Sequence, residues 1–198
     1  MVQDNAITQA LIEAMGHSPE AMVLTASDLP DHPMIAVNAA FSALTGYPPD
    51  EAVGRNCRFL QGSETDPEAS RRIGRCLAQQ RGCIEWIVNY RRDGTMFWNL
   101  LFLSPVFDET GKLLHVFGNQ RDITAGQPEE LPDYILGKAD MPAQGRREFD
   151  AVLREVNTEA QSAGGVGQKA SDRLLAAVHR LNELTIGLAA APWSAQAH

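Results

Sequence analysis

The residues of this chain best suited to chemistry lie in one string, residues 54–62, which reads GRNCRFLQG. If the string forms one or two helical turns, Cys57 and Gln61 project from the same side, because residues four apart are neighbours on a helix. Arg58 lies at the edge of that side. Its guanidinium suits a phosphate, and an amide beside it can meet both donors and acceptors of a heterocycle. A single cysteine is most often a small buried residue. The polar residues Arg58 and Gln61 beside Cys57 are therefore what predicts a binding site.

Three amide side chains on the later predicted strands give an independent indication. A four-residue hairpin loop at residues 108–111 would set Asn99 opposite Gln120, and a three-residue loop containing Gly94 would set Asn89 opposite Asn99. Buried amides without partners cost on the order of 1–3 kcal/mol each. Three of them side by side among apolar neighbours therefore predict a bound polar ring edge. The alternative is that the amides satisfy one another or water.

The elements that must position these side chains follow from hydrophobic spacing and turn residues. Strands are expected at residues 22–26, 34–37, 84–91, 96–107 and 113–121. Short helices are expected at residues 39–44 and 68–80. Strands at the start, helices in the middle and a three-stranded meander at the end favour an α+β fold with an antiparallel sheet.

Helical patterns also occupy both ends of the chain. Residues 4–15 place apolar side chains on one face, with Gly16 as the stop. Helices are expected again at residues 147–160 and 170–190, and the second has apolar positions spaced by alternating fours and threes, which suits a helix–helix seam. Two interpretations remain open: the terminal helices cover the domain's own core, or they form a dimer.

Length and composition bound the class of protein. The 198 residues suit one domain with appended segments, and 44% hydrophobic residues can supply a core. A net charge of -8 argues against nucleic-acid binding through a broad basic face. We expect a helix or cap at residues 1–16, a core at residues 17–125, and a linker with a helical extension at residues 126–198.

Hydropathy and cysteine usage exclude other classes. No run approaches the ~20 apolar residues of a membrane span, and the start lacks the positive residues of a secretory signal. We therefore expect no membrane partner and a cytoplasmic location. The three cysteines, Cys57, Cys76 and Cys83, show neither a disulfide framework nor metal-ligand spacing.

At these residues the sequence resembles a known family. Residues 38–47, NAAFSALTGY, look like the early helix region of PAS domains, and residues 122–124, DIT, look like their usual ending. Residues 54–61, GRNCRFLQ, resemble without a mismatch the motif of LOV domains, the blue-light photoreceptors of the PAS superfamily. The resemblance spans about residues 22–124 and is of the short LOV type, without an effector enzyme domain.

The resemblance implies a PAS fold in which a five-stranded antiparallel sheet and short helices enclose a flavin, FMN. It makes Cys57 the photoreactive thiol, whose sulfur bonds reversibly to ring carbon C4a after blue light while N5 gains a proton. Gln120 faces N5 and acts as a hydrogen-bond switch. The remaining residues that the resemblance places on the flavin are Asn56, Arg58, Gln61, Asn89, Asn99, Val23, Thr25, Leu60, Leu101, Leu103 and Gly118.

One position departs from the family. LOV domains often carry a second phosphate-binding arginine on the next helix, and Gly74 stands there in this chain. Arg75 points ~100° away on an ideal helix, and Arg71, one turn earlier, is a possible substitute. FMN is still expected above riboflavin or FAD.

The implied function is a photoreceptor that is not an enzyme. Rotation of the Gln120 amide disturbs the last strand, and so the packing of the terminal helices, which changes homodimer formation or binding of an unknown signalling partner. One alternative is a flavin-binding redox sensor that ignores light. Another is a phosphoacceptor fragment of a two-component system, because residues 179–182, HRLN, faintly resemble a histidine kinase box around His179. Cys76 and Cys83 are expected to be incidental to this function, and Cys76, on a helix close to the proposed phosphate end, is the one of the two open to oxidation.

Overall fold

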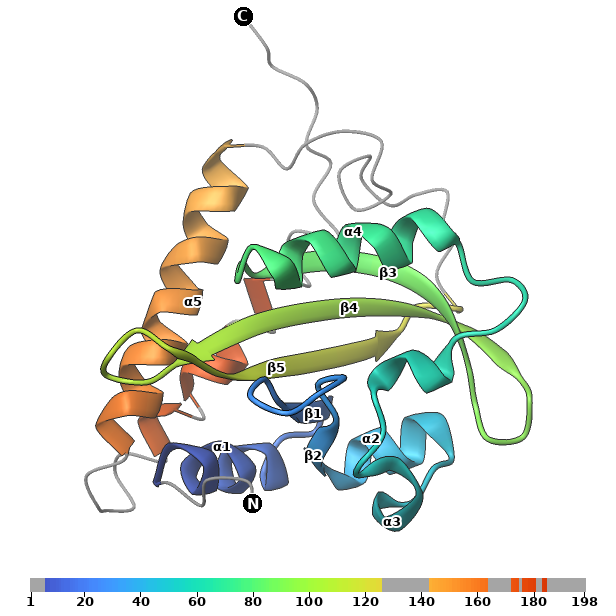
Figure 1. Ribbon diagram of the computed structural model, residues 1–198, viewed down its shortest axis with the longest axis horizontal. Coiled ribbons are helices and arrows are strands. Elements are labelled where there is room, and N and C mark those ends of the chain that lie inside the picture. The colour runs from blue at the N-terminus through green and yellow to red at the C-terminus, as the bar shows by residue number, and fades with distance from the viewer. Residues whose placement is uncertain (1–5, 126–142, 164–171, 175, 181–182, 185–198) are drawn as a thin grey trace, which may run out of the picture.

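The computed structural model describes residues 6–125, 143–163, 172–174, 176–180 and 183–184. A five-stranded antiparallel sheet with the order β2-β1-β5-β4-β3 forms its centre (Figure 1). The strands are β1 (Ala21–Ala26), β2 (Met34–Val37), β3 (Cys83–Tyr90), β4 (Met96–Phe107) and β5 (Leu113–Asp122). The predicted α+β class and each of the five strands are confirmed, with ends that differ by one residue at most.

The short helices between β2 and β3 lie on one face of the sheet, which we call the inner face. They are α2 (Ala39–Thr45), α3 (Pro49–Ala52), the 3-10 helix η1 (Cys57–Leu60) and α4 (Pro67–Ala78). The Asn38 side chain accepts a hydrogen bond from the backbone N–H of Phe41 and so begins α2, and Gly46, at φ 76°, ends it. The single-turn helix α3 was not predicted, because four residues show no periodicity.

Two terminal helices cover the opposite, outer face of the sheet: α1 (Ala6–Gly16) and α5 (Ala143–Ala163). The apolar stripe predicted for residues 147–160 is buried there, with Phe149, Val156 and Ala160 fully inaccessible to solvent. Asn157 of α5 donates to the carbonyl of Pro105 at 2.9 Å and accepts from the N–H of Phe107 at 2.9 Å, so polar bonds also fasten this helix to β4.

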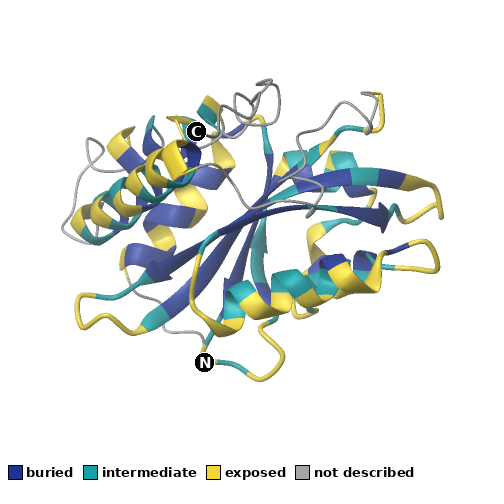
Figure 2. Ribbon diagram, turned by 90° about the horizontal axis from the view of Figure 1, so that it is seen from above, coloured by how far each residue is buried: buried dark blue, intermediate teal, exposed yellow. Residues whose placement is uncertain are grey.

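Part of the second C-terminal helix joins the same core. Residues 172–174, 176–180 and 183–184 are helical, and Leu174, Ala177 and Val178 are fully buried. The rest of the helix expected at residues 170–190, and the connector before α5, lie outside the described residues. In the described residues these apolar stripes cover the domain's own sheet, as the first interpretation expects (Figure 2). Dimer formation stays a prediction.

The predicted register of β4 against β5 is wrong by two residues. Asn99 pairs with Asp122, and Gln120 pairs with Leu101. A bulge between Val106 and Phe107 and a longer hairpin loop cause the difference, because each adds a residue between the paired positions.

The register of β3 against β4 is also wrong by two residues. Tyr90 pairs with Met96, so the loop has five residues where three were expected, and Asn99 lies opposite Ile87. A shift of two keeps every side chain on its predicted face, because side chains alternate with period two. The three amides therefore still share the inner face.

None of the helices in the part of the chain that the structure describes combines the length and the apolar character that crossing a bilayer demands.

Candidate functional site

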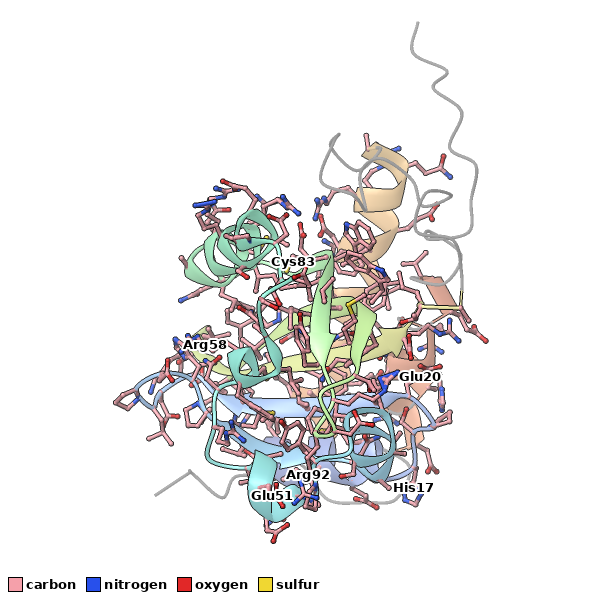
Figure 3. All side chains as sticks on the ribbon, turned by 90° about the vertical axis from the view of Figure 1, so that its right-hand side faces the viewer. His17, Glu20, Glu51, Arg58, Cys83 and Arg92 are labelled. Atoms are coloured by element: carbon pink, nitrogen blue, oxygen red, sulfur yellow. The ribbon has the colours of Figure 1, made fainter. Side chains whose placement is uncertain are left out.

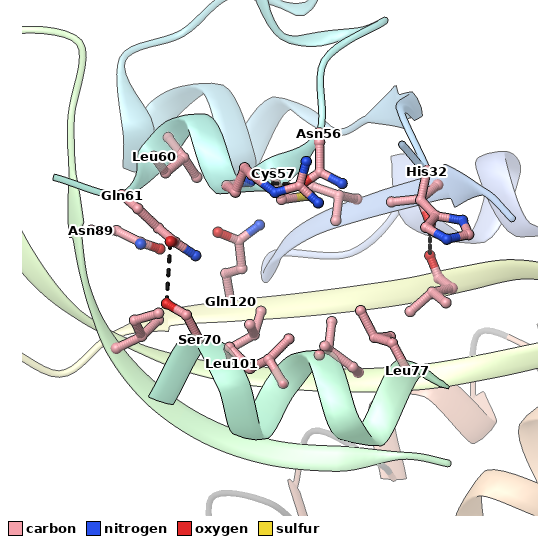
Figure 4. A pocket seen from close by; sticks show the side chains of 18 of the residues that line it. His32, Asn56, Cys57, Leu60, Gln61, Ser70, Leu77, Asn89, Leu101 and Gln120 are labelled. Atoms are coloured by element: carbon pink, nitrogen blue, oxygen red, sulfur yellow. Dashed lines mark hydrogen bonds between the residues drawn. The ribbon is translucent and has the colours of Figure 1, made fainter. Parts of the chain in front are cut away.

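A cavity of about 410 Å³ lies between the inner face of the sheet, η1 and α4 (Figure 4). This volume falls in the range of sites for small molecules and cofactors, ~300–1,000 Å³. The sequence-predicted site residues that line it are Val23, Thr25, Asn56, Cys57, Arg58, Leu60, Gln61, Asn89, Leu101, Leu103 and Gln120. Side chains that the sequence spreads over nearly a hundred positions thus surround one space.

The wall around Cys57 is a single 3-10 turn rather than the one or two α-helical turns that we expected. Asn56 begins it, because its side-chain oxygen accepts from the N–H of Arg58 at 2.9 Å. Residues three apart eclipse in a 3-10 helix, so Leu60 is the neighbour of Cys57 on that turn. Gln61 follows in extended conformation, at φ -82° and ψ 156°, and still lines the cavity.

Helix α4 forms the opposite wall and is pinned to the sheet by a bidentate ion pair. Arg72 donates to both carboxylate oxygens of Glu85 on β3, at 2.8 and 2.9 Å. Burial raises the pKa of Glu85, and the hydrogen bonds from Arg72 oppose that shift. The Asp66 side chain caps the helix by accepting from the N–H groups of Glu68 and Ala69. This wall is therefore held at both its start and its middle.

The Cys57 thiol is a neutral group in this environment. Part of its surface stays accessible because it lines the cavity, yet burial raises the pKa of the thiol to about 12, and its backbone hydrogen bond and the Arg58 charge offset this only partly. Cysteine nucleophiles in enzymes are instead activated by a lowered pKa. Cys57 is thus unsuited to ordinary thiolate catalysis.

The three amides form one hydrogen-bonded row on the inner face. Asn99 Nδ2 donates to Asn89 Oδ1 at 2.8 Å and to Gln120 Oε1 at 3.1 Å. All three residues are at least 95% buried. Asn99 Oδ1 is buried too, and it has no hydrogen-bond partner within the described residues. Asn99 itself is not among the residues that line the cavity. The amides satisfy one another only in part, and an orphaned buried acceptor calls for a donor from a ligand or a water molecule.

Two glutamines face the cavity with their nitrogens available. Ser70 Oγ donates to Gln61 Oε1 at 3.2 Å, and the oxygen of Gln120 is occupied by Asn99. Figure 4 shows the side chains of Gln61 and Gln120 directed into the same space. Each glutamine can therefore donate from Nε2 to an acceptor in the cavity.

Gly118 leaves room where a side chain would intrude. A Cβ at this position would lie 2.8 Å from Val23 Cγ2 and 3.4 Å from Leu103 Cδ2, and both of these residues line the cavity. Gly118 itself is not among the lining residues. A larger residue would push the lining side chains inward, so glycine keeps the cavity wide here.

Of the three arginines considered for a phosphate, only Arg58 reaches the cavity. It forms an ion pair with Asp31, and the two side chains remain 60% and 62% exposed. Arg71 pairs instead with Glu68 at 2.9 Å and is 60% exposed. Arg75 is exposed, and neither Arg71 nor Arg75 lines the cavity, where Gly74 stands.

The sequence reasoning missed further lining residues: Ser27, His32, Ser70, Ile73, Gly74, Leu77, Ala78, Ile87, Leu113 and Val116. The pattern of apolar residues in the sequence could have indicated several of them. Ile73 and Leu77 form the apolar stripe of α4, and Ile87 alternates with Asn89 on β3. No pattern in the sequence indicated Ser27 and His32, because a loop brings them to the cavity.

Comparison with known proteins identifies the class. The chain belongs to the PAS domain family, whose model matches residues 19–125. Blue-light-activated histidine kinase 1 of Erythrobacter litoralis is 42% identical over 117 residues, which are 59% of this chain and 32% of that protein. Phototropin-1A of Oryza sativa subsp. japonica is 41% identical over 134 residues, 68% of this chain and 14% of that protein.

Solved structures narrow the class further. The LOV domain of a blue-light-activated histidine kinase from Erythrobacter litoralis superposes with a TM-score of 0.53 at 40% identity, over 55% of this chain and 99% of that domain. Within the PAS family the chain is thus of the LOV type. It spans about a third of the length of the first of these relatives and less of the second.

Proposed function

We propose that this protein is a blue-light photoreceptor that binds FMN in the cavity and bonds it reversibly through Cys57. The observation that carries the proposal is the position of a neutral thiol, Cys57, on the wall of a cavity that Asn89 and Gln120 also line. Both of these amides are hydrogen-bonded to Asn99, whose Oδ1 is orphaned.

The polar groups of the cavity fit the edge of an isoalloxazine ring. That edge carries one N–H donor together with carbonyl and ring-nitrogen acceptors. Asn99 Oδ1 supplies the missing acceptor for the N–H, and the Nε2 groups of Gln61 and Gln120 supply donors. The apolar residues Leu60, Leu101 and Leu103 flank the ring faces. Arg58 is the phosphate ligand, and its exposure matches a charged group at the cavity mouth.

When bound, FMN supplies the absorption of blue light and the electrophilic carbon C4a. Cys57 would contribute its sulfur to the bound flavin: its S–H bond would break as an S–C bond to C4a formed, and its proton would pass to N5, so that no external reductant would be required. The raised pKa of Cys57 keeps the proton on sulfur until that moment. Return in darkness reverses each of these changes.

Gln120 relays the change to the strand that carries it. A protonated N5 becomes a donor, so the Gln120 amide must rotate to present Oε1, and the hydrogen bond that Asn99 Nδ2 now makes to this oxygen is lost. Gln120 pairs with Ala21 of β1 and Leu101 of β4. On the same strand Phe117 packs in the outer cluster with α1 and α5. The rotation therefore acts on the strand that both terminal helices cover.

The output in this proposal is a change in how α1 and α5 pack, and with it homodimer formation or binding of a signalling partner in the cytoplasm. The apolar stripe of α5 is buried on the domain's own sheet, so self-association through this stripe requires its release. His179 is half-buried, and incubation with a labelled phosphodonor tests the phosphoacceptor alternative.

The test is the visible absorption spectrum of the purified, flavin-loaded protein before and after blue light, with Cys57→Ala as the control. We expect reversible bleaching in the wild-type protein and none in the variant, while both bind flavin equally. Bleaching that persists in Cys57→Ala contradicts the proposal, and yellow wild-type protein that does not bleach supports the redox-sensing alternative. Extraction of the chromophore decides between FMN, riboflavin and FAD.

A further inference from the structure

Cys76 and Cys83, which the photochemistry does not use, meet at the end of α4. Helix α4 closes with a tight reversal: the N–H of Arg81 donates to the carbonyl of Cys76 at 3.0 Å, and Gln80 adopts a left-handed φ of 51°. The chain then enters β3 at Cys83. The two residues pack in one apolar cluster with Leu103 and Val116, so the reversal returns the second thiol to the first.

The two thiols differ in exposure and in acidity. Cys76 is half-buried and Cys83 is only 5% exposed. A hydrogen bond from the Cys83 thiol lowers the pKa of Cys76 to about 7, against the opposing effects of burial and of Glu85. The same contact, together with burial, raises the pKa of Cys83. The contact thus favours the thiolate form of Cys76 beside a protonated Cys83 thiol.

Positive charge stabilises this thiolate from two sides. Arg81, in the reversal itself, and Arg146, on the first turn of α5, both lower the pKa of Cys76. Cys83 lies between α4 and α5 in Figure 3. A thiolate that is accessible, flanked by cations and adjacent to a second thiol is the arrangement of redox-sensitive cysteine pairs.

We propose that Cys76 and Cys83 form a peroxide-reactive dithiol site that closes to an intramolecular disulfide. The Cys76 thiolate attacks hydrogen peroxide, the O–O bond breaks, and the products are a sulfenic acid on Cys76 and, after uptake of one proton, water. The Cys83 thiol then attacks the Cys76 sulfur, the S–O bond breaks, and a second water leaves with the Cys83 proton. The two thiols are oxidised by two electrons, the peroxide is reduced, and a thiol reductant reverses the reaction.

The site adjoins both the cavity and the C-terminal helix. Leu77 and Ala78, the two residues that follow Cys76, line the cavity. Gly82, next to Cys83, is so close to α5 that a Cβ there would lie 2.2 Å from Leu153 Cδ1. A covalent bond between α4 and β3 therefore constrains one wall of the cavity and the surface on which α5 packs.

The sequence allows a clean test, because trypsin places each cysteine in its own peptide: residues 56–58, 76–81 and 82–91. The full chain is treated with hydrogen peroxide, alkylated, separated on a non-reducing gel and digested. We expect the monomer band to contain peptides 76–81 and 82–91 joined by a disulfide that a thiol reductant removes. Before oxidation, brief alkylation at neutral pH should label peptide 76–81 first.

Matched variants complete the test. Cys83→Ser should leave the Cys76 sulfenic acid unresolved, so that a sulfenic-acid probe labels it, and Cys76→Ser should abolish both the label and the cross-link. Three results overturn the proposal: recovery of both peptides unoxidised, oxidation of Cys76 in the wild-type protein to the sulfinic acid without a cross-link, or a cross-link confined to a dimer band. None of these readouts depends on flavin or light.

Discussion

The same strands form both faces of the sheet, but one face is packed against helices and the other borders a cavity. The outer face is packed: Phe102, Val106 and Phe117 lie in one buried apolar cluster with residues of α1 and α5. The inner face keeps a cavity of about 410 Å³ and places buried amides against it. The outer face supplies the stability and the inner face supplies the ligand chemistry. Because residues alternate along β5, a single strand carries both Gln120 and Phe117.

The contrast also shows how a signal can cross the sheet. A packed interface responds to a small displacement in one strand, because close-packed interiors transmit strain. A cavity lined by hydrogen-bonding side chains can change its bonds without collapsing. In the proposed function, the inner face therefore senses and the outer face responds.

The largest expected effect is on the outer face, in Phe149→Ala of α5. The side chain is fully buried, and truncation of such a phenylalanine costs about 3–5 kcal/mol. We expect this loss in the free energy of unfolding measured with a chemical denaturant. Ile73→Ala, on the inner face, should cost less because Ile73 is only half-buried. Equal losses would mean that the two faces contribute alike to stability.

Asn99 on the inner face and Asn119 on the outer face offer a matched pair of substitutions that compares the two faces. Asn99→Leu removes the inner-face acceptor and should weaken flavin binding by about 1–3 kcal/mol, or roughly 5-fold to 150-fold. Asn119→Leu, on the outer face of β5, is the matched control, since Asn119 is also buried. It should affect stability and leave flavin affinity unchanged. Titration of the folded apoproteins with FMN measures the difference, and equal affinities for the two variants would contradict the assignment.

A smaller expected effect is the dependence of stability on pH, through His115 on the outer face. His115 Nδ1 lies 3.1 Å from the carbonyl of Thr25, which can only accept, so Nδ1 carries the proton and Nε2 accepts from Thr8 Oγ1 of α1 at 2.8 Å. Burial lowers the pKa of His115, opposed by the Thr25 carbonyl and by the charge of Asp28. The unfolded chain, with a pKa of about 6.5, therefore takes up the proton first.

Stability should fall as the pH drops through about 6.5 and below, until the folded protein is protonated as well. Denaturant unfolding between pH 7.5 and about 5 measures the slope, and His115→Gln should make it shallower. An unchanged slope in this variant would assign the pH dependence to other groups.

The smallest expected effect lies at the mouth of the cavity. Asp31 competes with a phosphate for Arg58, and the exposed ion pair is worth about 0.2–1 kcal/mol. Asp31→Asn should thus tighten FMN binding up to about fivefold and leave riboflavin binding unchanged, because riboflavin has no phosphate. Calorimetric titration with the two flavins separates these outcomes. An equal gain for both would show that Asp31 does not act through the phosphate.

The strands, the α+β class and the inner-face position of the three amides were predictable from the sequence. The three amides were placed on the correct face despite two register errors. Each error was an even number of residues, and side chains two residues apart on a strand lie on the same face of the sheet. The loop lengths that caused those errors were not predictable, since the bulge between Val106 and Phe107 and the five-residue loop after Tyr90 follow from the pairing of whole strands and not from the turn residues alone. The predicted roles of the site residues remain predictions.

By itself the sequence determined the alternation of side chains between the two faces of each strand, the residues that cap the helices, and the local string around Cys57. Each of these features depends on residues within a few positions of one another. Tertiary structure decided the rest. The pairing of Arg58 with Asp31 and the docking of α5 on its own sheet both depend on where distant segments meet. Local propensity acts over one or two turns of chain, whereas these contacts form only when the whole sheet buries its two faces.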